Sequence, residues 1–128
     1  MSDLKPTGTL INVDGVERRV LFTISAIYKL QDKEKKPISE IINECLNSSD
    51  DVAETMNWTI GVLEVLSNDE AERTGDKEKL VKPGHFKSFI TAKNVYAILA
   101  LLLVEYGIDL PEPEDDDNPN AKGGQQMK

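Results

Sequence analysis

Cysteine and histidine are almost absent from this chain of 128 residues, which contains only Cys45 and His85. A single cysteine cannot form an intramolecular disulfide, and a reducing compartment is the expected setting for such a chain. One histidine and one cysteine are too few for a His/Cys metal site or for a supported nucleophile and base. We interpret Cys45 as a small buried side chain on an apolar helical face, and His85 as an exposed or turn-stabilising residue.

The sequence motifs of common enzymes and metal sites are also missing. The chain has no GxGxxG, no Walker loop and no HExxH. Its acidic runs at residues 69–72 and 114–117 lack the alternating oxygen ligands, central glycine and distant glutamate of an EF-hand loop. We therefore expect no catalytic, cofactor-binding or metal-binding residues, and a protein that is not an enzyme.

Basic charge and long apolar runs are scarce. The 23 acidic residues outnumber the 15 basic ones, and the resulting net charge of −8 disfavours binding to nucleic acid or to an anionic membrane surface. The longest apolar run covers residues 95–104, whereas a membrane-spanning helix needs about 20 residues. The N-terminus, MSDLKPTGTL, has no signal-peptide pattern, so we expect a cytoplasmic protein.

The order of local signals predicts an α+β fold that is mainly α. Asp14-Gly15 lies between two β-prone runs and predicts a hairpin, in which both turn residues would need positive φ. Thr23 can cap a helix with Ile24, Ile27 and Tyr28 on one face, and the charges before Pro37 would end it. Further helices are expected at residues 38–46, 51–67 and 92–106, with an exposed loop at 68–83 and a short turn or helix at 85–90.

These elements define one domain by length and composition. We expect a flexible N-terminus at residues 1–7, a single globular domain at 8–107 and a disordered acidic tail at 108–128. Aromatic residues make up only 5% of the chain, so aliphatic side chains must form the core.

The last predicted helix is apolar on two faces. A second face, roughly opposite the first, consists of Ala97, Ala100, Leu101 and Val104. The first face carries Ala92, Val95, Tyr96, Leu99, Leu102, Leu103 and Tyr106. Two interpretations are open: the chain's own elements bury both faces, or the second face is a protein interface that the two alanines allow a partner to approach closely.

Two segments of the chain resemble the tail assembly chaperones of long-tailed bacteriophages and related prophage-like elements. Residues 13–30, VDGVERRVLFTISAIYKL, look like the family's opening, a short hairpin followed by a helix. Residues 106–113, YGIDLPEP, look like its exit from a terminal helix into an acidic tail that contains proline.

This resemblance implies a non-enzymatic protein that binds the tape measure and tail tube proteins and prevents their premature polymerisation. It also implies self-association, a place in the host bacterial cytoplasm and absence from the mature virion. The family supplies no catalytic residues to transfer. Alternatives are a phage structural component, such as a tail terminator or head–tail connector, and an acidic inhibitor or adaptor that binds a host protein.

Overall fold

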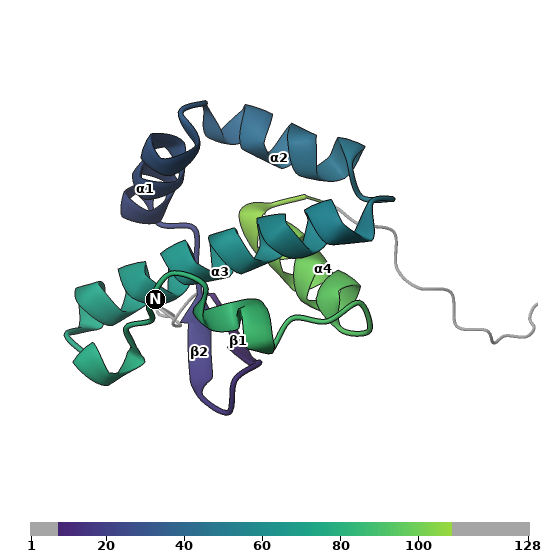
Figure 1. Cartoon of the computed structure of the whole chain (residues 1–128). Helices are drawn as coiled ribbons and strands as arrows, with labels where there is room; N and C mark the ends of the chain where they lie inside the picture. Colours follow the sequence, from purple (N-terminus) through teal and green to yellow (C-terminus); the bar gives the residue numbers. More distant parts are fainter. Residues whose placement is uncertain (1–7, 109–128) are drawn as a thin grey trace, which may run out of the picture.

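The computed structural model describes residues 8–108, which form a two-stranded β-hairpin followed by four α-helices and two short 3-10 helices (Figure 1). The predicted α+β, mainly helical fold is confirmed. The predicted flexible segment at residues 1–7 lies outside the described residues. So does the predicted disordered tail at 108–128, except for Ile108, which packs against the core.

The hairpin pairs β1 (Thr9–Asn12) with β2 (Glu17–Val20) in antiparallel register, with Asn12 opposite Glu17. The connection is four residues long, and Gly15 is its one residue with positive φ, at 84°. The expectation of positive φ at Asp14 is therefore wrong. The wider loop lets the Asn12 Oδ1 atom accept a 2.9 Å hydrogen bond from the Gly15 N–H, and Asp14 turns its carboxylate toward β2.

Helix α1 (Ile24–Glu34) begins as predicted, because the Thr23 hydroxyl oxygen accepts a hydrogen bond from the Ala26 N–H at 3.0 Å. Its buried face was predicted wrongly: Ala26 and Leu30 point into the core, whereas Ile24 and Tyr28 are exposed. The helix ends at Lys35, whose φ is 59°. Helix α2 (Ile38–Asn47) follows Pro37, and its predicted apolar face is buried at residues 41, 42 and 45.

Helix α3 (Val52–Thr74) extends seven residues beyond the predicted end at residue 67. Asp51 caps its start by accepting a 3.1 Å hydrogen bond from the Glu54 N–H. The helix continues through this highly charged segment because Asp69 and Ala71 are buried. Gly75, with φ of 74°, ends the helix.

The 77–90 segment is held against α3 by side-chain bonds that replace regular structure. The Asn68 amide donates to the Val81 carbonyl and accepts from the Val81 N–H, at 3.1 and 2.8 Å. Two short 3-10 helices, η1 (Lys77–Lys79) and η2 (His85–Ser88), lie in this segment, and Phe86 of η2 is fully buried. The predicted short turn or helix near residue 85 is thus confirmed.

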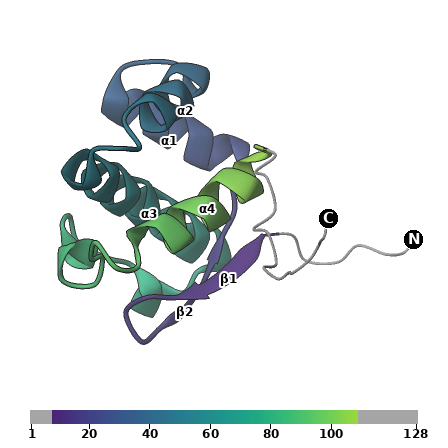
Figure 2. The ribbon, with the colours of Figure 1, turned by 90° about the vertical axis from the view of Figure 1, so that its right-hand side faces the viewer.

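The long helix α3 is the centre of the domain. Helices α1 and α2 lie along one side of it, and the hairpin and η segments lie along the other (Figures 1 and 2). Helix α4 (Val95–Tyr106) also packs on α3, beside β1. The core is mainly aliphatic, as expected; its largest fully buried side chains include Leu30, Leu63, Leu66, Phe86, Ile90 and Leu102.

Candidate functional site

The inward face of α4 belongs to the core of the domain. Its five buried residues recur at helical spacing and belong to the two hydrophobic clusters that make up the core. They are Val95, Ile98, Leu99, Leu102 and Leu103. Ile98 was not assigned to either face from the sequence. These contacts fix the rotation of the helix about its axis, and they therefore determine which residues face solvent.

The outward face of α4, defined by Ala97, Ala100, Leu101 and Val104, is not covered by any described part of the chain. Leu101 is 42% exposed and Val104 is 57% exposed. Ala97 is also exposed, and Ala100 is partly exposed. The structure thus brings the four predicted interface residues together on one solvent-facing surface. Within residues 8–108, the other interpretation of this helix, burial of both faces by the chain's own elements, does not hold.

The outward face of α4 continues into a shallow groove of about 380 Å³ between α4 and β1. Leu10, which is 49% exposed, and Val13 form the strand side of the groove, and Ala97 and Leu101 form part of the helix side. Sequence reasoning missed Leu10. The position of Leu10 in the strand could have indicated its exposure. Successive strand residues point to opposite sides, and its neighbour Ile11 is buried.

Hydrogen bonds at both ends of α4 hold this surface in place. Before the helix, the Thr91 N–H donates to the Asn94 side chain at 2.8 Å, and the Asn94 N–H donates to the Thr91 hydroxyl at 3.2 Å. After it, the Ile108 N–H donates to the Leu103 carbonyl at 2.9 Å across Gly107, whose φ is 117°. Gly107 thus ends the helix after residue 106, the predicted last residue.

A buried ion pair braces the hairpin against η2. The Arg18 guanidinium lies 2.8 Å from the Asp14 carboxylate, and the two side chains are only 5% and 2% exposed. Arg18 also donates to the Lys79 carbonyl at 2.7 Å and lies over the Phe86 ring, while His85 Nε2 lies 2.7 Å from Asp14. The cluster is closed to solvent on the Asp14–Arg18 side, so it is suited to holding elements together rather than to binding a substrate.

The electrostatics of this cluster favour an ionised Asp14. Burial by itself would raise the pKa of the carboxyl group. The hydrogen bonds from Arg18 and His85, together with the Arg18 charge, outweigh burial and lower the pKa of Asp14 to about 2. Arg18 and Val20 are the two buried residues of β2 and lie on the same face of the strand.

A second polar cluster joins α1 to α3. Asp69, buried in α3, accepts hydrogen bonds from the Thr23 hydroxyl at 2.7 Å and from Lys29 at 3.1 Å. Burial opposes ionisation of Asp69, but the hydrogen bonds from Thr23 and Lys29 lower its pKa. Thr23 therefore both caps α1 and binds α3, which explains why this helix start is so well defined.

The remaining chemistry-bearing residue, Cys45, is buried, and burial raises the pKa of its thiol to about 11. Such a thiol is protonated at neutral pH and unreactive. Within residues 8–108, no three His, Cys, Asp or Glu side chains lie where they could together hold a metal ion. None of the helices in the same range has the length and apolar character needed to cross a membrane.

Comparisons with known proteins add no family assignment. No protein-family model matches the chain, and neither curated proteins nor solved structures gave a match. A function can therefore be inferred only from the residues of this chain, above all from the outward face of α4, and from the resemblance carried by residues 13–30 and 106–113.

Proposed function

We propose that this protein is a non-enzymatic tail assembly chaperone of a long-tailed phage or prophage-like element. In this role it binds the tape measure and tail tube proteins in the host bacterial cytoplasm and prevents their premature polymerisation. It is then absent from the finished virion. The single observation that carries the proposal is the outward face of α4, where the exposed Leu101 and Val104 lie together with two alanines on one helix surface.

The composition of this surface suits temporary cover of another apolar helix. None of its four residues is charged, so a partner helix can approach without desolvating an ion. Ala97 and Ala100 are short enough to let two helix backbones come close, and Leu101 and Val104 supply apolar area. The same features allow self-association through α4, which the proposal also includes.

The charge of the whole chain supports the same role. A chaperone that covers apolar segments needs a surface that keeps the complex from aggregating, and a net charge of −8 supplies mutual repulsion. The charges lie outside the outward face of α4, so repulsion between complexes and attraction for the client do not compete at the same residues.

Co-purification with the tape measure and tail tube proteins tests the proposal, with Leu101→Glu and Val104→Glu as the central variants. Both positions are exposed, so each variant should keep its melting temperature, with stability changed by less than about 0.5 kcal/mol. Each should lose most of the co-purified client and shift any oligomer toward monomer, because a carboxylate would have to be desolvated at the interface.

Tyr28→Glu is the matched control, because Tyr28 is an exposed aromatic residue on a different helix, α1. It should retain the client. Equal client binding by the control and both α4 variants would contradict the proposal. Recovery of the protein from purified virions by mass spectrometry would instead indicate a structural component.

A further inference from the structure

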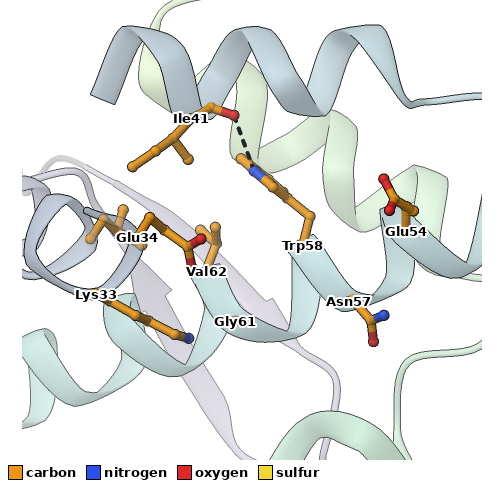
Figure 3. A pocket seen from close by; sticks show the side chains of 9 residues that line it. Lys33, Glu34, Ile41, Glu54, Asn57, Trp58, Gly61 and Val62 are labelled. Carbon is orange, nitrogen blue, oxygen red and sulfur yellow. Dashed lines mark hydrogen bonds between the residues drawn. The ribbon is translucent and has the colours of Figure 1, made fainter. Parts of the chain in front are cut away.

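A hollow of about 370 Å³ opens between α1, α2 and α3, on the side of the domain away from the hairpin (Figure 3). We call it the Trp58 hollow, after the chain's one tryptophan, which lines it. Pockets that bind ligands typically measure about 300–1,000 Å³, so the Trp58 hollow is large enough for one long side chain and its neighbours. An adjacent, more open hollow of about 320 Å³ shares Trp58 and Glu54 with it.

The indole of Trp58 is held in one position. Its Nε1–H donates a 3.2 Å hydrogen bond to the Ile41 carbonyl, and its ring packs against both hydrophobic clusters while remaining partly exposed. Because the N–H is already used, the indole offers a partner its ring surface rather than a donor. A fixed aromatic ring surface attracts apolar groups and cations.

Gly61 opens the floor of the hollow. It lies one turn of α3 after Trp58, and a Cβ atom at this position would come within 3.0 Å of the Lys33 Nζ atom. Glycine inside a helix costs stability compared with alanine. The helix bears this cost at Gly61, and the absent methyl group leaves its space to the hollow.

Negative charge predominates around the ring. Glu34 and Glu54 lie on opposite sides of the indole in Figure 3, and neither side chain forms a hydrogen bond or ion pair within residues 8–108. Glu44 adds a carboxylate in the adjacent hollow and is paired with Lys36. Lys33 is the one cation that lines either hollow. The C-terminal end of α1, at Glu34, contributes further negative potential.

We propose that the Trp58 hollow binds an arginine or lysine side chain of a partner polypeptide. The cation would lie against the indole between Glu34 and Glu54, and apolar neighbours in the partner would contact Leu30 and Val62 at the walls. Charge complementarity identifies this occupant, since two carboxylates that form no hydrogen bond or ion pair in the described residues, beside a fixed aromatic ring, favour a cation with an apolar stem. The site is separate from the outward face of α4 and does not depend on the function proposed for it.

Trp58 fluorescence in the full-length protein tests this inference directly. The probe is a blocked hexapeptide of alternating leucine and arginine, compared with the same peptide carrying glutamate in place of arginine. We expect a saturable change in emission with the arginine peptide and none with the glutamate peptide. Glu34→Gln with Glu54→Gln should weaken binding by about tenfold.

Two control proteins separate the Trp58 hollow from general charge and from loss of folding. Glu17→Gln with Glu78→Gln removes the same charge from β2 and η1 and should bind like the wild type. Gly61→Ala should raise the melting temperature, because its methyl group meets only the flexible end of Lys33, and yet weaken the peptide by about tenfold.

Three outcomes would overturn the inference. The first is no saturable change in Trp58 emission with the arginine peptide. The second is an equal loss of affinity in both double variants, which would mean that net charge alone attracts the peptide. The third is unchanged affinity in a stabilised Gly61→Ala protein, which would place the peptide outside the hollow.

Discussion

Arg18 and Asp14 place two opposite charges where water hardly reaches them. Such a pair offsets its own desolvation only when every polar atom finds a partner. Here Arg18 bonds to Asp14 and to the Lys79 carbonyl and lies over Phe86, while Asp14 also meets His85. The pair therefore fixes how the hairpin and the η segments lie relative to one another.

Removal of one member of this pair should be costly. Asp14→Asn leaves the Arg18 guanidinium buried without a counter-charge, so the free energy of unfolding should fall by about 3 kcal/mol at neutral pH. Urea denaturation followed by circular dichroism measures the difference. A loss below about 1 kcal/mol would show that the ion pair contributes little to the fold.

The same carboxyl group makes stability depend on acidity in a defined window. Folding lowers the pKa of Asp14 from 3.8 to about 2, so its ionised form stabilises the native state fully above about pH 5. As the pH falls from about 4 toward 2, the carboxyl group becomes protonated and roughly 2 kcal/mol is lost. The difference between wild type and Asp14→Asn, measured across this range, should shrink accordingly, because the other carboxyl groups are common to both proteins.

No local sequence pattern identifies the partners of Arg18 and Asp14. His85 is 71 residues away in the chain, and only the tertiary fold brings it to Asp14. The sequence-based view of His85 as a turn-stabilising residue was therefore incomplete, because no local pattern records a contact of this range.

At the scale of elements, the ends of helices were more predictable than their buried faces. Thr23 and Gly107 act through atoms within a few residues, so their roles could be deduced from sequence. The buried face of α1 and the length of α3 depend on distant neighbours. Ala26 turns inward and Ile24 outward because of where α3 lies, which a helical pattern alone does not specify.

The backbone at the end of α1 is strained, and a glycine substitution should relieve the strain. Lys35 is the one non-glycine residue in the described range with positive φ, and its exposed ion pair with Asp32, at 3.6 Å, adds little. Lys35→Gly should therefore raise the free energy of unfolding by about 1 kcal/mol. Lys35→Ala, which keeps the strain and removes the side chain, should give no gain. Equal stability of the two variants would contradict this explanation.

At the scale of the whole molecule, α3 is the common support for every other helix and for the hairpin. The hairpin and helix α2 lie on opposite sides of it (Figure 1). Most elements of the domain contact this one helix, so the loss of one of them should weaken the others.

We therefore expect a single cooperative transition. In Asp14→Asn, the change is made on the hairpin side, yet the denaturation midpoint reported by Trp58 fluorescence should move as far as the midpoint reported by circular dichroism. Separate midpoints would mean that α1 and α2 unfold independently of the hairpin side.

Only part of the candidate binding surface could be predicted from the sequence, because only the grouping of residues on one helix face is a local property. A helical wheel grouped Ala97, Ala100, Leu101 and Val104, because that grouping is local. Their exposure could not be deduced, since the chain contains enough apolar residues to have covered them. The contribution of Leu10 depends on β1 lying beside α4, a contact between the two ends of the domain.

Those two ends are joined directly. The Thr9 hydroxyl donates a 2.9 Å hydrogen bond to Glu105, across 96 residues of sequence. A domain whose ends adjoin can be circularly permuted. A chain that begins at the exposed Gly75 turn, and that links residue 108 to residue 8 through a short spacer, would keep the neighbours of the core. It would also dispense with residues 1–7 and 109–128, and so separate what the folded domain binds from what those residues contribute.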